Sequence, residues 1–152
     1  MEDVIIKYIR TGSDMDAQIK TPEYATPGSA GMDLSACIPG EIAIKPGEIA
    51  KVNTGIAIQI PNNSIGGFIF PRSGLSSKHG ISLANCVGVI DSDYTGELIC
   101  PVINHSSTEY TIKPGDRIAQ LVFLPVIKAR LQETDKLDTT ERGSGGFGST
   151  GV

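Results

Sequence analysis

Apolar residues in this chain alternate with a period of two, and turn residues interrupt the alternation at short intervals. Isoleucine occurs at Ile56, Ile58 and Ile60, which predicts a strand with one buried face. Pro39-Gly40 and Pro46-Gly47 are turn dipeptides on either side of another short strand. No segment carries the apolar repeat of an amphipathic helix of three turns. The sequence therefore predicts an all-β fold, a sandwich or a jelly roll.

The composition agrees with many short strands joined by tight turns. The chain has 152 residues, enough for one domain that buries roughly 68–70% of its unfolded surface without a disulfide. It contains 18 glycines and 9 prolines, which suits turns better than long helices. Its three cysteines, Cys37, Cys86 and Cys100, form no C-x-x-C pair, so we expect reduced thiols that are mostly packed in the interior.

The charge balance excludes some classes of partner. A formal net charge of −4 and a pI near 5.1 argue against a nonspecific binder of nucleic acid or of anionic membranes. The N-terminus lacks the pattern of a signal peptide, and no apolar run is long enough to cross a membrane. We therefore expect a soluble, cytoplasmic protein. A polyanionic substrate would need local cations or a metal ion.

Three further segments are predicted to form strands. Residues 4–9 are expected to form the first strand, and residues 33–38 alternate like a half-buried strand. Pro101 lies in an apolar run and predicts an edge strand or a bulge, because proline cannot donate to a sheet ladder.

A short helix is predicted at 74–79, with Ser73 as its N-cap. The N-terminus of a helix offers unpaired N–H groups and a partial positive charge, so this segment could bind an anion. Arg72 would add a fixed cation, and Gly74 would let a phosphate approach the main chain. The alternative is a surface arginine beside a capped helical turn.

The segment 115–123 is expected to contain a turn followed by a strand. In that strand Ile118, Gln120 and Val122 would share a face, so that Gln120 would face a site or an interface. Asp116 and Arg117 are expected to form a structural or intersubunit pair rather than to be catalytic.

Residues 85–96 begin and end with turn formers and alternate between them, which predicts a β-hairpin. Its tip would present Asp91, Asp93 and Tyr94. The alternative is that the two aspartates only close an Asx-turn. An EF-hand is excluded because the twelfth position is Val102, where calcium requires a glutamate.

Five stretches, in this order and spacing, resemble the five motifs of the trimeric dUTPase family (deoxyuridine triphosphate nucleotidohydrolases). They read GSAGMDL from position 28, PRSGLSSKHG from 71, NCVGVIDSDYTG from 85, GDRIAQL from 115 and RGSGGFGSTG from 142. The resemblance spans roughly residues 22–151. It implies a distorted jelly roll with one short helix.

The resemblance also implies a reaction. The family hydrolyses dUTP to dUMP and pyrophosphate by Mg²⁺-assisted attack of water on the α-phosphate, which keeps uracil out of DNA and supplies dUMP for dTMP synthesis. Mg²⁺ would be held mainly by the substrate phosphates and water, with no direct protein ligand. Asp33 would order Arg72 and a water molecule on the metal.

Site residues are assigned by the same resemblance. Asp91 would orient and deprotonate the attacking water. The substrate would be bound by residues from four motifs: Arg72, Ser73, Gly74 and Gln120 at the phosphates, Asn85, Gly88, Ile90 and Tyr94 at the uracil and sugar, and Arg142, Phe147 and Gly148 in the C-terminal arm.

The resemblance further implies a homotrimer with shared active sites. Residues 1–141 would form the β domain, and 142–152 would form a mobile, glycine-rich arm that closes over the active site. The G-x-G-x-x-G pattern in this arm is not a dinucleotide fingerprint, because too few residues follow it to form the required helix.

Two rival functions remain open at this point. A dCTP deaminase shares the fold but needs a glutamate as acid and base, where this hairpin offers Asp91 and Tyr94. A nucleotide-binding module without catalysis is the other, although no motif residue is degraded here.

Overall fold

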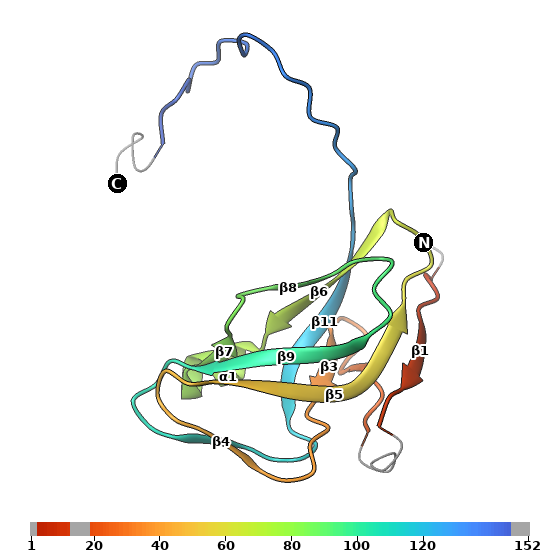
Figure 1. Ribbon diagram of the computed structural model, residues 1–152, viewed down its shortest axis with the longest axis vertical. Coiled ribbons are helices and arrows are strands. Elements are labelled where there is room, and N and C mark those ends of the chain that lie inside the picture. Colours follow the sequence, from red (N-terminus) through yellow and green to blue (C-terminus); the bar gives the residue numbers. More distant parts are fainter. Residues whose placement is uncertain (1–2, 13–18, 147–152) are drawn as a thin grey trace.

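The computed structural model describes residues 3–12 and 19–146 (Figure 1). The strands are β1 (Lys7–Arg10), β2 (Glu23–Tyr24), β3 (Met32–Ser35), β4 (Ile42–Ile44), β5 (Ile49–Gln59), β6 (Ile65–Pro71), β7 (Ile81–Leu83), β8 (Gly88–Ile90), β9 (Glu97–Asn104), β10 (Tyr110–Ile112) and β11 (Arg117–Pro125). The helix α1 (Ser73–His79) lies between β6 and β7 in the chain.

The described strands form two large antiparallel sheets with a shared apolar core, and one two-stranded sheet. One sheet has the order β1-β5-β9-β7 and the other β2-β3-β11-β6-β8, while β4 and β10 pair separately. The core draws on both sheets and includes Leu34, Val52, Ile69, Leu98 and Leu121. Burying such side chains contributes roughly 1.5–3 kcal/mol each. The all-β prediction is confirmed.

The isoleucines predicted to lie on a buried strand face are buried, but the predicted start of the first strand is wrong. Ile56, Ile58 and Ile60 are all buried, as their alternation predicts. The first strand, however, begins at Lys7 and not at position 4. Lys7 pairs with Gln59, so residues 4–6 would lie opposite a segment that contains Pro61 and a turn. The ladder ends there because its partner strand ends.

The predicted strand 33–38 is shorter than expected. β3 ends at Ser35, although Ala36, Cys37 and Ile38 remain buried. The N–H of Ala36 donates to the carbonyl of Asp116, and the N–H of Cys37 donates to the carbonyl of Asn53 in the other sheet. These three residues cross from one sheet to the other. Their apolar side chains are buried, but their backbone does not continue the strand.

The expectation of an edge strand or a bulge at Pro101 is wrong. Pro101 pairs with Lys51 inside β9, which lies between β5 and β7. The Pro101 carbonyl accepts from the N–H of Ala84, just beyond the end of β7. Within an antiparallel strand the N–H and carbonyl of a residue point to the same side. The position where Pro101 lacks an N–H therefore faces the turn after β7, so its absence costs the sheet no hydrogen bond.

The predicted hairpin at 85–96 is also corrected. Its two arms, β8 and β9, lie in different sheets: β8 pairs with β6, while β9 pairs with β5 and β7. The chain crosses from one sheet to the other at the turn between them. A hairpin ladder would have closed the space between these strands, so the division leaves a gap that the sequence pattern did not reveal.

Beyond β11 the chain leaves the body as an extended arm (Figure 1). Its last backbone bond to the body runs from the N–H of Val126 to the carbonyl of Ser64. Ile127, Leu131 and Leu137 in this arm are 84–96% exposed. The chain therefore separates from the body well before position 142, where the arm was predicted to begin.

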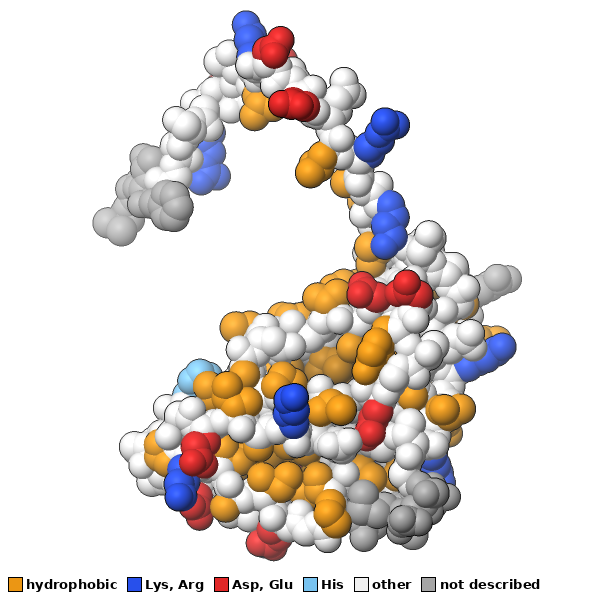
Figure 2. Space-filling model, viewed as in Figure 1, with side chains coloured by type: hydrophobic (Ala, Val, Ile, Leu, Met, Phe, Trp, Pro, Cys, Tyr) orange, Lys and Arg blue, Asp and Glu red, His pale blue; other side chains and the backbone are white. Residues whose placement is uncertain are grey.

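Apolar side chains also gather on the outer surface of the sheet that contains β5 and β9 (Figure 2). Among them, Ile49 and Ile99 are more than one third exposed. In the described part of the chain, no helix is long and apolar enough to span a membrane.

Candidate functional site

Asp91 lies at the turn where the chain passes from β8 to β9. The N–H of Tyr94 donates to the Asp91 carbonyl at 3.1 Å, which closes the turn. The Asp91 side chain is exposed and has no hydrogen-bond or ion-pair partner among the described residues. It borders a cleft of about 160 Å³ between the two strands. The cleft is lined by Val89, Ile90, Asp91, Tyr94, Glu97, Leu98 and Ile99.

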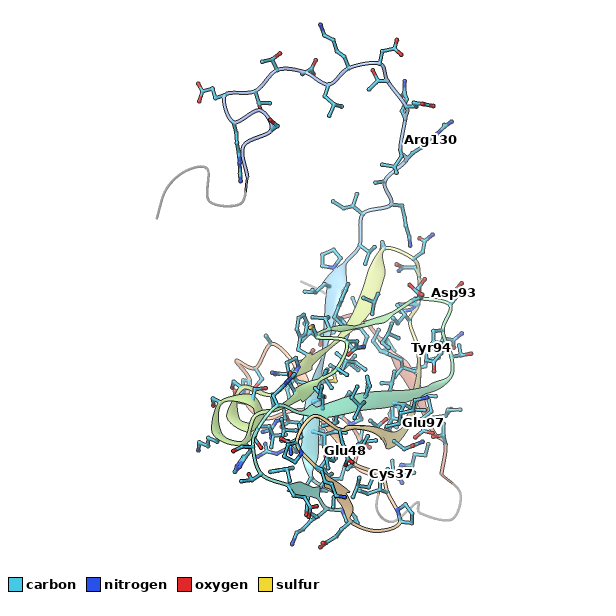
Figure 3. The ribbon with its side chains drawn as sticks, turned by 60° about the vertical axis from the view of Figure 1, so that its left-hand side comes forward. Cys37, Glu48, Asp93, Tyr94, Glu97 and Arg130 are labelled. Carbon is cyan, nitrogen blue, oxygen red and sulfur yellow. The ribbon has the colours of Figure 1, made fainter. Side chains whose placement is uncertain are left out.

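Tyr94 folds back over its own turn. Its hydroxyl donates to the Glu97 carbonyl at 2.9 Å, and Figure 3 shows Asp93, Tyr94 and Glu97 on the same side of the molecule. A Cβ atom added to Gly96 would lie 2.6 Å from the Tyr94 hydroxyl oxygen. Glycine is therefore required at position 96 to let the ring pack there.

The opposite end of β8 is a tight turn that carries two predicted substrate-binding residues. Asn85 is exposed, and Cys86 adopts a left-handed backbone with φ of 61°. An added Cβ at Gly88 would lie 3.2 Å from Cβ of Ile69 and 3.6 Å from the Asn85 amide nitrogen. The absence of a side chain at Gly88 thus keeps β8 close to β6 and leaves space for the Asn85 side chain.

A second group of predicted residues surrounds the start of α1. The helix begins one residue earlier than predicted, with Arg72 at the N-cap position, and no side chain caps it. Ser73 is thus the first helical residue and not the cap. The first intrahelical bond comes from the N–H of Ser76 to the Arg72 carbonyl, which leaves the N–H groups of Ser73 and Gly74 without helical partners. A Cβ on Gly74 would meet nothing within 4 Å, so packing within the chain does not require glycine there.

Three charged side chains form a cluster beside this helix end. One Asp33 oxygen, Oδ1, lies 3.0 Å from Nε of Arg72, and the other, Oδ2, lies 2.9 Å from Nη1 of Arg117. Within one chain Asp116 and Arg117 therefore do not pair with each other, although Arg117 has a structural ion pair with Asp33. Asp116 instead accepts a hydrogen bond from the Lys113 N–H at 2.8 Å and closes the turn before β11. Sequence reasoning missed Arg117 as a member of this site because its partner is 84 residues away.

Gln120 lies next to the cluster, on the face that it was predicted to share with Val122, but Ile118 does not share that face. The pairing of β11 with β3 skips one residue between Arg117 and Ala119. This bulge turns Ile118 into the core, while Gln120 remains partly exposed. The Gln120 amide donates to the Pro71 carbonyl at 3.1 Å, immediately before Arg72. A Cβ on Gly31 would lie 3.3 Å from Oε1 of Gln120, so this glycine makes room for the amide.

One chain does not bring Asp91 and Arg72 together. Gly88 pairs with Ile69 and Ile90 with Gly67, so Asp91 lies opposite Gly66 near the start of β6, and Arg72 lies one residue beyond its end. Six residues of strand separate the two positions, about 20 Å at 3.3 Å per residue. Figures 1 and 3 place α1 and the β8–β9 turn at opposite ends of the body.

The arm contributes little to either group within this chain. The Arg142 side chain donates from Nε to the Gly145 carbonyl at 2.8 Å. Phe147 and Gly148 lie outside the described residues. Among residues 3–12 and 19–146, no three His, Cys, Asp or Glu side chains cluster as direct protein ligands of a metal would.

Burial raises the pKa of Tyr110, which lines a pocket with Arg72 and Arg117. The neighbouring charge of Asp116 also raises this pKa, while that of Arg72 lowers it.

Ile99 is a further residue that the sequence did not single out. It lines the Asp91 cleft from β9 and is 42% exposed.

Known proteins resemble this chain over nearly its whole length. The dUTPase family model matches residues 17–151. A deoxyuridine 5'-triphosphate nucleotidohydrolase of Desulfitobacterium hafniense is 54% identical over 149 residues, which cover 98% of this chain and 96% of that protein. The same enzyme of Tolumonas auensis is 55% identical over 130 residues, or 86% of each chain.

Solved structures agree with these relatives. A dUTPase mutant of Staphylococcus bacteriophage 80alpha with dUpNHpp superimposes with a TM-score of 0.85 at 26% identity, covering 97% of this chain and 99% of that one. A mutant dUTPase from phage phi11 of S. aureus, with a structural Mg(II) ion, is 22% identical and has a TM-score of 0.76. The predicted jelly roll and the predicted enzyme class are confirmed, as is the resemblance drawn from the five motifs. The chain belongs to the dUTPase family of enzymes.

Proposed function

We propose that this protein hydrolyses dUTP to dUMP and pyrophosphate by attack of water on the α-phosphate. The observation that carries the proposal is the position of Asp91, whose carboxylate has no partner among the described residues and borders a small cleft lined by both aliphatic and polar side chains. A carboxylate in this position can orient a water molecule and accept its proton, which contributes roughly 10²–10⁴ in rate. Removal of dUTP would keep uracil out of DNA, and the dUMP released would serve dTMP synthesis.

The cleft between β8 and β9 suits a uracil ring and its sugar. Backbone groups from Asn85 to Ile90 would pair with the edge of the base, and cytosine would leave those groups unpaired, a penalty on the order of 10⁴–10⁵ in specificity. The small volume of the cleft, about 160 Å³, supports exclusion of the thymine methyl group. Tyr94, held by Glu97 and Gly96, would lie under the sugar and disfavour a 2′-hydroxyl.

The triphosphate would bind at the start of α1. Arg72 supplies a cation, the N–H groups of Ser73 and Gly74 supply donors, and the Gln120 amide lies beside them. The open space at Gly74 would let a phosphate reach the main chain. Arg142 with Phe147 and Gly148 would close over the nucleotide, the arginine on phosphate and the aromatic ring on the base.

The residues present fit a magnesium ion that arrives with the substrate. Both Asp33 oxygens are engaged by arginines, so Asp33 suits a role in ordering Arg72 and water better than direct ligation. Mg²⁺ usually retains waters and binds through substrate phosphates. When bound, it would neutralise phosphate charge that this acidic protein offsets only locally.

The distance between Asp91 and Arg72 supports a homotrimer with shared sites. Because about 20 Å of strand separates them, a nucleotide whose sugar meets Asp91 needs the phosphate-binding residues of another copy. A closed ring of three chains would provide three such sites. The arm, which leaves the body, would supply Arg142 to a site from a third direction.

The reaction is tested by supplying Mg²⁺ with dUTP, dCTP, dTTP or UTP and separating the products by anion exchange. We expect dUMP and pyrophosphate from dUTP only. Consumption of dCTP would indicate a deaminase, and the absence of turnover would indicate a nucleotide-binding module.

Shared sites are tested by subunit mixing. Homotrimers carrying Asp91→Asn or Arg72→Ala should both be inactive. In every mixed trimer one site would combine an intact Asp91 with an intact Arg72, so a random equal mixture should recover about one quarter of the wild-type activity. A site contained in one chain would recover none. Sedimentation of the wild type as a monomer at micromolar concentration would also contradict the model.

A further inference from the structure

We propose that Arg117 is a positioning residue for this reaction. It holds Asp33, and through Asp33 and its own carbonyl it directs the Arg72 guanidinium toward the phosphates. The inference rests on the proposed function, because it assumes that Arg72 binds the triphosphate. It concerns a residue that the sequence analysis assigned to a structural or intersubunit pair.

Arg117 holds the other two charged residues through two separate groups. Its Nη1 lies 2.9 Å from Oδ2 of Asp33. Its main-chain carbonyl accepts a hydrogen bond from Nη1 of Arg72 at 3.2 Å. Arg72 is thus fixed at Nε by Asp33 and at Nη1 by Arg117. In the described part of the chain, its other terminal nitrogen, Nη2, has no hydrogen-bond partner and can donate to an anion.

The bulge in β11 explains how Arg117 reaches this place. Arg117 pairs with Ser35, but the next registered pair is Ala119 with Leu34, so Ile118 is the inserted residue. Ile118 and Ala119 both point into the core, at 4% and 0% exposure. A bulge of this kind re-aims the neighbouring side chain. Arg117 is therefore left on the outer face, on the same side as Asp33.

The cluster also has a competing arrangement that Arg117 prevents. A carboxylate and a guanidinium favour a bidentate pair with two parallel hydrogen bonds. If Oδ2 of Asp33 lost Arg117, Arg72 could turn and use a terminal nitrogen on that oxygen. Such a pair would consume the donor that the phosphate needs. With Arg117 present, Asp33 is shared between two cations, and the cluster keeps one net positive charge.

The side-chain exposures agree with this division of roles. Asp33 and Arg72 are 22% and 26% exposed, while Arg117 is 53% exposed at the rim. An exposed ion pair adds little to stability, about 0–1 kcal/mol. We therefore expect substitution of Arg117 to affect the geometry of the site more than the stability of the fold.

The first test compares Arg117→Met and Arg117→Lys with the wild type. We expect Arg117→Met to lower kcat/KM for dUTP by about 10- to 100-fold, the usual cost of losing a residue that orients a binding group. Its affinity for a nonhydrolysable dUTP analogue should fall with it. Arg117→Lys can still donate to Oδ2 of Asp33 and should stay within about three-fold of the wild type. Equal losses in the two variants would contradict the proposal.

The matched control is Lys113→Met. It removes one positive charge from the neighbouring turn together with an ion pair to Glu41, 3.5 Å away and more than half exposed. Its kcat/KM should match the wild type. A loss as large as that of Arg117→Met would mean that charge alone accounts for the effect.

A double-mutant cycle separates positioning from direct contact with the substrate. If Arg117 acts through Asp33, adding Arg117→Met to Asp33→Asn should cost little beyond the single change. If Arg117 touches the phosphates itself, the two losses should multiply, which would overturn the proposal. Failure of the proposed function looks different, since the wild type would then not hydrolyse dUTP at all. Thermal unfolding of each variant would show whether the fold is retained.

Discussion

The two ends of β6 hold their functional groups in different ways. At the Arg72 end, charged side chains fix one another: Asp33 contacts two arginines, and the carbonyl of one arginine supports the other. At the Asp91 end the backbone sets the geometry, through a turn closed by Tyr94 and a ring packed on Gly96. The Asp91 carboxylate itself has no partner among the described residues.

This difference predicts how substitutions behave. A change at the Arg72 end releases its neighbours, so effects there should be coupled and hard to assign to single residues. A change to the Asp91 carboxylate removes a group that supports nothing else in the chain. Its effect should fall on chemistry and spare both folding and binding.

Asp91→Asn should therefore give the largest and cleanest effect. We expect dUMP formation to fall by about 10²–10⁴, the range for loss of a general base. Affinity for a nonhydrolysable dUTP analogue and the melting temperature should stay near those of the wild type. Steady-state kinetics, calorimetric titration and thermal unfolding check the three quantities. Persisting turnover would mean that Asp91 is only structural.

Removal of residues 142–152 should affect the groups at both ends of β6, because this segment is proposed to contact both the phosphates and the base. Loss of a stacked aromatic residue costs about 1–3 kcal/mol, so kcat/KM should fall by about five-fold or more. The trimer and its melting temperature should be preserved, since the hydrogen bonds of residues 142–146, the described part of the removed segment, reach no further than Thr140. Unchanged kinetics would remove the arm from the mechanism, and sedimentation would confirm the oligomeric state.

The sequence predicted the strands and the helix well because both depend on local patterns. Alternation placed Ile56, Ile58 and Ile60 in the core, and a helix was expected within one residue of where α1 begins. Relations between distant segments were predicted less well. The Asp33–Arg117 ion pair joins residues 84 positions apart, and the division of β8 and β9 between two sheets depends on which strands they meet.

The bulge at Ile118 shows the same limit within a single strand. One inserted residue reverses the alternation, so a strict period of two placed Ile118 and Gln120 on one face when they lie on opposite faces. Nothing in the segment marks the insertion, because both Ile118 and Ala119 are apolar. Only the pairing with β3 reveals it.

Two glycines allow a sharper comparison of the ends. Gly74→Ala adds a methyl group where the chain has open space, and alanine favours a helix, so stability should be unchanged or slightly higher. Affinity for the triphosphate should nevertheless fall by about ten-fold or more, because the phosphate approaches that space. Titration with the nonhydrolysable analogue checks this. Undiminished affinity would mean that phosphate does not reach Gly74.

Gly96→Ala should do the opposite at the Asp91 end. Its methyl group would collide with the Tyr94 ring and break the hydroxyl bond to Glu97, at a cost of about 1 kcal/mol in stability. Discrimination between dUTP and UTP should weaken as the ring moves from the sugar. Competition kinetics with dUTP and UTP measure this discrimination. An unchanged ratio of kcat/KM for the two nucleotides would exclude Tyr94 from sugar selection.

The last prediction concerns the core that joins the two ends. Cys100 lies on β9, one residue beyond the cleft-lining Ile99, and burial raises its pKa to about 12. The native protein therefore retains this proton while the unfolded chain loses it above about pH 9. The free energy of unfolding should fall as pH rises between these values, by up to about 1.4 kcal/mol per pH unit. Urea unfolding at pH 8, 9 and 10 should show a weaker pH dependence in Cys100→Ala. Parallel curves for the two proteins would mean that the thiol is accessible to solvent, and that β9 does not form a closed core behind the Asp91 cleft.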